Sequence, residues 1–233
     1  APAPQRKGFR KKAVPKLFTL KDVGYRNILD IDNLLIPPLQ TTCVVGESGS
    51  GKTTLLKLLN NLLTCDRGEV LFKGDNLKSL DPVELRRKIV MLPQTPLIFP
   101  GTIKDNLLIG LQFAEKPFVS DDVLKDILMR MKLNKDLEGN AAELSGGEKQ
   151  RLAICRIMLM EPEALLLDEP TSALDDGTEE ATMETLVSYA RKNHKTLIVV
   201  THSREVAQKY GDIIVTLQDG KVLKVEERKN NDK

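Results

Sequence analysis

One segment constrains the fold of this chain more than any other, and it reads Gly46-Glu47-Ser48-Gly49-Ser50-Gly51-Lys52-Thr53. It fits the pattern G-x-x-x-x-G-K-[ST] in full, which is typical of a glycine-rich loop between a strand and a helix. The flanks agree, because the β-branched run at 41–45 predicts a buried strand and the apolar pattern at 54–59 predicts a helix. The sequence therefore predicts a strand, a tight loop and a helix in that order.

This segment, here called the phosphate loop, has the chemistry of an anion site. Glycines allow successive backbone N–H groups to turn inward around phosphate oxygens, and the positive end of the next helix points at the same place. Lys52 can reach the β- and γ-phosphates of a nucleotide, and the Thr53 hydroxyl can ligate Mg²⁺. The alternative is a plain Gly/Ser turn, which the full match in this context disfavours.

A second motif is an apolar run that ends in two acids, Ala164-Leu165-Leu166-Leu167-Asp168-Glu169-Pro170. Such a run is typical of a parallel strand covered on both faces, and open α/β sheets bind ligands at the carboxyl ends of their strands. We expect Asp168 to hold Mg²⁺, directly or through water, and Glu169 to orient or deprotonate the attacking water. Two acids alone would indicate a solvated strand end, but together with the phosphate loop they indicate a nucleotide site.

A third motif, Leu144-Ser145-Gly146-Gly147-Glu148-Lys149-Gln150-Arg151, opens a predicted helix at about 145–159. Ser145 can cap this helix, and the exposed amides of the Ser-Gly-Gly turn form an anion site. With this motif the chain resembles the ATP-binding subunit of an ABC transporter, whose signature is L-S-G-G-x-x-x-R. The resemblance implies an α/β P-loop NTPase (ABC ATPase) fold: a doubly wound, mostly parallel sheet, an antiparallel β subdomain and an inserted α-helical subdomain.

The resemblance runs from about residue 17 to about residue 225 and assigns further roles. Gln94 matches the Q-loop glutamine, Asp175 closes the D-loop, and His202 matches the switch histidine that contacts phosphate. Tyr25 lies where the family has an aromatic residue stacked on adenine, with simple packing as the alternative. The implied catalytic residues are Glu169, His202, Gln94 and Lys52; the implied metal ligands are Thr53, Gln94 and Asp168; the implied ATP-binding residues are Tyr25, Gly46, Glu47, Ser48, Gly49, Ser50, Gly51, Lys52, Thr53, Thr54, Ser145, Gly146, Gly147 and Asp175.

The predicted organisation has three regions. Residues 1–16 are Pro-rich and basic and are expected to form a disordered tail; residues 17–226 form the ATP-binding domain, with the helical subdomain at about 95–150; residues 227–233 form a charged tail. Strands are expected at 17–23, 28–36, 41–45, 68–72, 89–92, 164–168, 196–200 and 213–217. Further helices are expected at 83–87 after Asp81, from Ser120 to about Met131, at 178–191 and at 204–210.

Composition limits the partners. The net charge of +2 in 233 residues gives no field that would attract nucleic acid. No run approaches the roughly 18 apolar residues of a membrane span, and we expect no signal peptide. The three cysteines show no metal-ligand spacing. The resemblance then implies a cytoplasmic subunit, peripheral on the inner face of the cell membrane, that works with a separately encoded integral membrane permease.

The family also implies an assembly and a mechanism. Two subunits form a head-to-tail homodimer, in which the signature of one copy covers the ATP on the phosphate loop of the other. We therefore expect Ser145 and the amides of Gly146 and Gly147 to complete the site of a partner copy and to exclude water from it. The cofactors implied are ATP and Mg²⁺.

The transported substrate is less constrained. Residues 93–107 and the compact helical subdomain resemble those of small bacterial two-component ABC exporters. Among these, the overall pattern is most similar to the ATPase subunit of the iron (metal-ion) export systems, but phosphate and amino-acid importers use similar ATPases. A non-transport ABC ATPase of DNA repair or translation is a further alternative, although the sequence contains neither a long coiled coil nor a second such domain. A degenerate regulatory module is disfavoured because the residues expected to react are all intact, namely Lys52, Asp168, Glu169 and His202.

Overall fold

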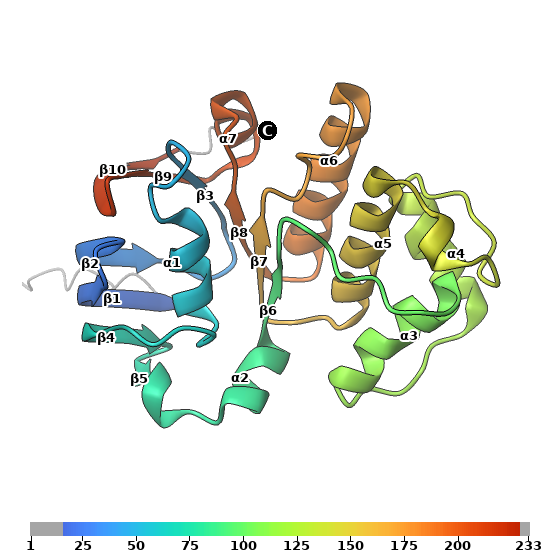
Figure 1. Cartoon of the computed structure of the whole chain (residues 1–233), viewed down its shortest axis with the longest axis horizontal. Coiled ribbons are helices and arrows are strands. Elements are labelled where there is room, and N and C mark those ends of the chain that lie inside the picture. The colour runs from blue at the N-terminus through green and yellow to red at the C-terminus, as the bar shows by residue number, and fades with distance from the viewer. Residues whose placement is uncertain (1–15, 229–233) are drawn as a thin grey trace, which may run out of the picture.

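Within residues 16–228, the part of the chain that the computed structural model describes, two β-sheets are flanked by helices (Figure 1). Of the tails predicted at 1–16 and 227–233, residues 1–15 and 229–233 lie outside this range. The strands are β1 (Phe18–Tyr25), β2 (Leu29–Ile36), β3 (Thr41–Val45), β4 (Arg67–Phe72), β5 (Asp75–Asn76), β6 (Ile89–Leu92), β7 (Ala164–Asp168), β8 (Thr196–Val200), β9 (Ile213–Gln218) and β10 (Lys221–Glu227). The helices are α1 (Lys52–Leu59), α2 (Pro82–Lys88), α3 (Ile103–Phe113), α4 (Asp121–Arg130), α5 (Gly146–Leu159), α6 (Asp176–Lys192) and α7 (Arg204–Tyr210), with 3-10 turns η1 (Leu77–Ser79) and η2 (Ala141–Glu143).

The larger sheet has the strand order β10-β9-β3-β8-β7-β6. All neighbours from β9 to β6 are parallel, and only β10 is antiparallel to its neighbour. Parallel neighbours end at the same edge of a sheet, so the residues that follow β3, β6, β7 and β8 gather there. The predicted doubly wound, mostly parallel sheet is confirmed.

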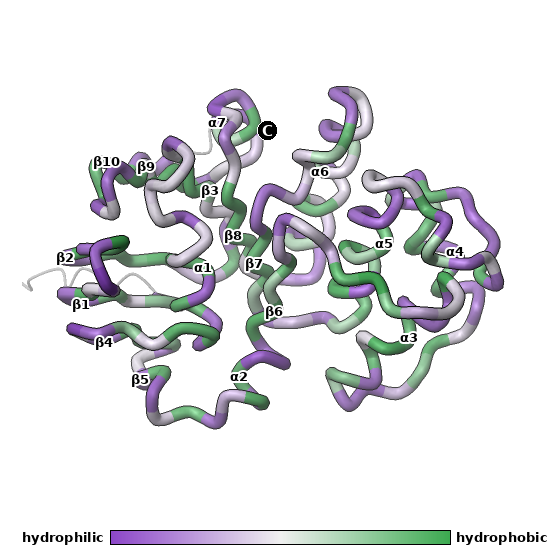
Figure 2. Tube along the Cα trace, viewed as in Figure 1, coloured by the Kyte–Doolittle hydropathy of each residue, from purple (hydrophilic) through white to green (hydrophobic). Residues whose placement is uncertain are grey.

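The central strands are buried on both faces, as their apolar sequences predict. In β7, Leu165 and Leu167 face one hydrophobic cluster, and Ala164 and Leu166 face another. This alternation follows from the two-residue period of a strand. Figure 2 shows β6, β7 and β8 as mostly hydrophobic segments in the middle of the molecule.

The smaller sheet is antiparallel, with the order β2-β1-β4-β5, and it confirms the predicted antiparallel β subdomain. It packs with α1 over one face of the larger sheet, and Leu55 and Leu58 of α1 are fully buried there. The rings of Phe18 and Phe72 meet inside this cluster with centroids 5.3 Å apart. The phosphate loop therefore sits on a helix that is packed on both sides.

The helical subdomain lies on the opposite side of the larger sheet and consists of α3, α4 and the first part of α5 (Figure 1). The apolar spacing predicts a buried face of Val123, Leu124, Ile127, Leu128 and Met131. Helix α4 buries Leu124, Ile127 and Leu128, and Met131 after it is buried too, but Val123 is exposed, so the prediction is wrong for that residue. Ser120 stands at its N-cap as predicted, but its hydroxyl accepts no capping hydrogen bond. Helix α3 was not predicted; a reciprocal capping box between Thr102 and Asp105 starts it.

The edge strand β10 was not predicted either. It runs to Glu227, so the first residue of the predicted charged tail is paired with Ile213 of β9. Among the helices of residues 16–228, none combines the length and the apolar character that crossing a bilayer requires.

Candidate active site

The phosphate loop connects β3 to α1, and its glycines are required by position. Gly51 precedes α1 with φ of 100°, a left-handed conformation, and a Cβ there would lie 2.6 Å from Cδ2 of Leu29. A Cβ at Gly46 would lie 2.1 Å from the carbonyl oxygen of Leu217. Other residues at these two positions would therefore change the path of the loop.

Lys52 is the first residue of α1, and its amine stays within the loop. The Nζ atom donates to the carbonyl oxygens of Gly46 at 2.9 Å and Glu47 at 2.7 Å. Burial lowers the pKa of Lys52, and the charges of Glu169 and Asp168 act against this shift. The loop thus holds a cation beside two carboxylates, in a place where phosphate oxygens could replace the carbonyls as acceptors.

Asp168, the last residue of β7, lies against the start of α1. The Thr53 hydroxyl donates to Asp168 Oδ2 at 2.8 Å. Burial raises the pKa of Asp168, although the Thr53 hydrogen bond opposes it. A hydroxyl and one carboxylate suit Mg²⁺, which takes oxygen ligands and usually combines one or two carboxylates with phosphates and water. Thr53 and Asp168, two of the three residues predicted to hold the metal, therefore fit it.

Glu169 follows Asp168 and is held from two sides. The Gln94 amide donates to its Oε2 at 2.9 Å, and His202 Nε2 lies 2.5 Å from its Oε1. The three residues come from the loops after β7, β6 and β8, which are neighbours in the sheet. The Glu169 backbone N–H also donates to the carbonyl of Val200, the last residue of β8. This pairing explains why Glu169 and His202 meet.

These groups surround one open cavity of about 420 Å³. Its walls combine the phosphate loop with the ends of the neighbouring strands, so a cation, hydroxyls and a carboxylate face the same space. Ile28, which follows β1, also lines it, and no sequence signal identified this residue. The lining residues are Ile28, Ser48, Gly49, Gly51, Lys52, Thr53, Thr54, Gln94, Glu169 and His202.

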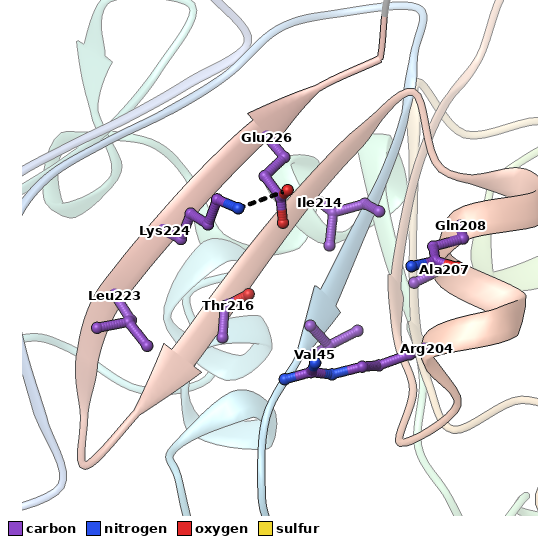
Figure 3. A pocket seen from close by; sticks show the side chains of 9 residues that line it. All are labelled: Val45, Arg204, Ala207, Gln208, Ile214, Thr216, Leu223, Lys224 and Glu226. Atoms are coloured by element: carbon purple, nitrogen blue, oxygen red, sulfur yellow. Dashed lines mark hydrogen bonds and ion pairs between the residues drawn. The ribbon is translucent and has the colours of Figure 1, made fainter.

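Some predicted ATP-binding residues lie elsewhere. Gly46 and Glu47 line a neighbouring cavity of about 340 Å³, which they share with His202. Tyr25 is buried, with the Arg26 guanidinium 5.3 Å from its ring centroid, and it does not line the 420 Å³ cavity. Figure 3 shows a further cavity, of about 290 Å³, between β9, β10 and α7. None of the predicted site residues lines that one.

The signature turn, Ser145–Gly147, is built separately at the start of α5. The Ser145 hydroxyl accepts from Glu148 N at 3.3 Å, and the Glu148 carboxylate accepts from Ser145 N at 2.9 Å. The Lys135 side chain and this Ser145 amide lower the pKa of Glu148 to about 2. Within residues 16–228, the signature turn contributes nothing to the cavity beside the phosphate loop.

The D-loop packs directly against the signature turn. A Cβ at Gly147 would lie 2.9 Å from Leu174 Cδ2, so only glycine fits this contact without movement. Asp175 caps α6 by accepting from Thr178 N at 3.0 Å, and the Thr178 hydrogen bonds lower the pKa of Asp175. Ser145 and Asp175 therefore belong to one surface, apart from the phosphate loop.

Comparison with known proteins agrees with this arrangement. The family profile described as ABC transporter matches residues 29–172. This chain belongs to the ABC transporter family. The part of the family that it matches is the ATP-binding ATPase, which is a separate subunit in some similar proteins and a portion of a longer chain in others.

ABC relatives differ in what they transport and in their length. "Probable iron export ATP-binding protein FetA" of Escherichia coli (strain K12) is 35% identical, over 87% of this chain and 91% of FetA. "Phosphate import ATP-binding protein PstB 3" of Natronomonas pharaonis is 35% identical, over 89% of this chain and 78% of that protein. "ABC-type transporter fsqE" of Aspergillus fumigatus is 37% identical over 89% of this chain, which spans only 17% of the length of fsqE.

Solved ABC structures share the whole architecture. A dimeric structure of MJ0796, described as a bacterial ABC transporter cassette, superposes with a TM-score of 0.82 at 31% identity, over 91% of this chain and 99% of that one. A post-hydrolysis dimer of the same cassette, bound to ADP and Pi, has a TM-score of 0.80 at 30% identity. The ABC ATPase fold predicted from the motifs is confirmed.

Proposed function

We propose that this chain hydrolyses ATP at a site completed by a second copy of itself, and that this hydrolysis drives a membrane permease. The observation that carries the proposal is the position of Glu169, held between Gln94 and His202 opposite the phosphate loop. A carboxylate that lines this open cavity of about 420 Å³ is placed to accept a proton from water.

Polar groups in and beside the cavity then have distinct roles. The amides of the phosphate loop and the Lys52 ammonium bind the β- and γ-phosphates. Thr53 and Asp168, with Gln94, would hold Mg²⁺, which supplies positive charge to the phosphate oxygens. Glu169 takes the proton of the attacking water, while Gln94 and His202 set the direction of its two oxygens. Tyr25 as an adenine platform stays a prediction.

The second copy is needed because the signature turn lies outside the cavity. The Gly146 backbone is exposed, and a Cβ there would meet no atom within 4 Å, so an anion could approach its N–H. We propose that the signature turn and Asp175 meet the nucleotide of a partner in a head-to-tail homodimer. The dimeric structures of the similar cassette MJ0796 support this arrangement.

The role of Glu169 is tested by Glu169→Gln, which keeps the shape and removes the base. ATP turnover should fall by roughly 10²-fold or more, the usual scale for a general base, while ATP still binds. Glu163→Gln is the matched control, because Glu163 precedes β7 and pairs with Lys73 at the other end of the same strand. Equal turnover in the parent and in Glu169→Gln would refute the assignment.

For the transported substrate we propose a metal ion, exported by a permease on a separate chain at the inner face of the cell membrane. The likeness to FetA over 91% of its length supports both points. The equal identity to PstB 3 makes phosphate import the competing assignment.

The transport assignment is tested on membranes of cells that express the tagged chain. A polytopic membrane protein should co-purify, and inside-out vesicles should take up ⁵⁵Fe when ATP is added, with Glu169→Gln vesicles as the control. Uptake of labelled phosphate by right-side-out vesicles instead would favour an importer. Recovery without any membrane protein would favour a non-transport ATPase.

A further inference from the structure

An acid directly follows the signature turn, which is unexpected beside a candidate anion site. Glu148 is the third residue of α5, and its carboxylate accepts from Ser145 N at 2.9 Å. A carboxylate at this position stabilises the start of the helix. The same negative charge, however, repels a phosphate that approaches the neighbouring amides of the turn.

Lys135 supplies the opposite charge from another part of the chain. It belongs to the loop between α4 and η2, and its Nζ atom lies 2.9 Å from Oε1 of Glu148. The Lys135 side chain and the Ser145 amide lower the pKa of Glu148 to about 2. The carboxylate is therefore ionised at neutral pH, and the Lys135 ammonium balances its charge.

The loop that carries Lys135 is fixed by its neighbours. Leu133 and Leu137, on either side of Lys135, are buried. The carbonyl oxygen of Leu137 also accepts from Lys104 N at 2.9 Å, which ties the loop to the start of α3. The backbone at Lys135 is thus held close to Glu148 by the fold itself, and the ion pair does not have to recruit a mobile segment.

Other charged residues near the signature turn do not replace this pair. The Glu143 carboxylate, two residues before Ser145, accepts instead from Asn140 Nδ2 at 3.3 Å. Within residues 16–228, no ion pair other than Lys135–Glu148 involves residues 144–151. Removal of the Lys135 ammonium would therefore leave the Glu148 charge without a partner at the turn.

We propose that Lys135 is a positioning residue that acts through Glu148: its ammonium balances the carboxylate and so lets the signature turn accept the phosphate of a partner's nucleotide. An unbalanced Glu148 would hold a negative charge within hydrogen-bond distance of the Ser145 amide, in the turn whose outward amides meet that phosphate. A dimer contains two such turns, so the repulsion counts twice. This inference rests on the proposed head-to-tail dimer.

The exposure of the pair gives the proposed effect a signature of its own. The Lys135 side chain is 43% exposed and the Glu148 side chain is 22% exposed, so both are reached by dissolved ions. Salt screens the interaction of such charges. A loss of dimerisation caused by an unbalanced Glu148 should therefore be largest at low salt, whereas a loss of packing would not depend on salt in this way.

The test uses Lys135→Ala in the Glu169→Gln background, with ATP-dependent dimerisation followed by light scattering. At about 50 mM NaCl, half-maximal dimerisation should need roughly 10-fold more protein, because each of two turns then repels a phosphate. At about 500 mM NaCl the difference should become much smaller. The calorimetric ATP affinity of the single copy should stay nearly unchanged, since neither Lys135 nor Glu148 lines the cavity beside the phosphate loop.

A second substitution separates charge from structure. Because glutamine carries no charge, Lys135→Ala combined with Glu148→Gln should dimerise like Glu148→Gln alone. Glu143→Gln is the matched control for this rescue, since it removes a nearby acid that does not pair with Lys135, and it should not restore the dimer. Lys132→Ala, which removes the same charge from the same loop, should dimerise like Glu169→Gln itself.

Three results would overturn the proposed role of Lys135. A structural role predicts a loss that persists at high salt and in the combined variant with Glu148→Gln. A direct contact between Lys135 and the partner's nucleotide likewise predicts no rescue by Glu148→Gln. An equal loss in Lys132→Ala would show a general effect of positive charge. Failure of Glu169→Gln alone to dimerise with ATP would instead count against the head-to-tail dimer.

Discussion

The phosphate-loop end and the signature turn are two candidate anion sites built in opposite ways. At the first, burial raises the pKa of Asp168 and lowers that of Lys52, so both groups carry their charges at a cost. At the second, the Glu148 carboxylate is bonded to Ser145 and Lys135, and its pKa falls to about 2. The charges at the phosphate-loop end would be balanced by a bound ligand, whereas the polar groups of the signature turn are already hydrogen-bonded without one.

This difference indicates that the two candidate sites have different functions. Groups with perturbed pKa values in a cavity are typical of sites that bind and react. A capped turn with its own hydrogen bonds complete is instead rigid, and only its outward amides are free for a partner. We infer that the phosphate-loop end binds the nucleotide alone, whereas the signature turn acts only when another copy presents its nucleotide.

The largest effect that tests this contrast is expected at Lys52. Lys52→Ala removes charge-assisted hydrogen bonds, each of about 1.5–3 kcal/mol, so ATP affinity measured by calorimetry should fall by about 10²-fold or more. Lys78→Ala is the control, because that amine bonds the Cys65 carbonyl. An affinity within twofold of the parent would show that the loop does not bind phosphate through Lys52.

A smaller effect is expected at Asp168, where substitution should stabilise the fold of the nucleotide-free protein. Because the pKa is raised in the fold, ionised Asp168 destabilises the folded state at neutral pH, and this penalty fades as acid protonates it. Without nucleotide, Asp168→Asn should raise the melting temperature by about 2–4 °C near pH 7, which corresponds to roughly 1 kcal/mol in the free energy of unfolding. The increase should be smaller near pH 4.

Addition of Mg²⁺ and ATP provides the second half of that experiment. The parent should gain thermal stability from the bound ligand, whereas Asp168→Asn should gain much less. Calorimetric scans with and without Mg²⁺-ATP make the comparison. A lower melting temperature for nucleotide-free Asp168→Asn would contradict the claim that this carboxylate is held at a cost.

The smallest effect is expected at the signature turn. Glu148→Gln weakens the capping box and should lower stability at pH 7 by about 0.5–1 kcal/mol, or about 1–3 °C. The lowered pKa means that this stabilisation is complete above the ordinary value of 4.5 and is lost as pH falls toward 2. Thermal scans should show the parent and the variant converging below pH 4.5, and a constant difference would count against the assignment.

The sequence alone predicted those parts of the candidate site in which the chemistry allows few residue types at each position. The phosphate loop, Asp168 and Glu169 lie where their motifs predict, because a glycine turn and acids after an apolar strand have few other uses. Helix α3 was missed because Gly110 lowers its helix propensity, yet the structure needs that glycine beside Arg156.

Other features depended on tertiary contacts. The alternation in β10 is weak because four of its seven residues are charged, a composition that suits an exposed edge strand. Ile28 enters the cavity only because β1 and β2 bring it there, and Tyr25 is buried under Arg26. The hydrogen bond from Arg156 to Asn106 joins residues 50 positions apart, so no local pattern could reveal it.

The most direct test of the account is whether the signature turn completes the site of a second copy. In light scattering, Glu169→Gln should be monomeric without nucleotide and dimeric with ATP, because this variant does not hydrolyse the ATP that holds the closed dimer together. Adding Ser145→Arg should abolish this dimer, since a long cation replaces the small cap at the turn, while ATP affinity of the single copy stays nearly intact. A double variant that still dimerises with ATP would contradict the claim that Ser145 acts on the partner's nucleotide.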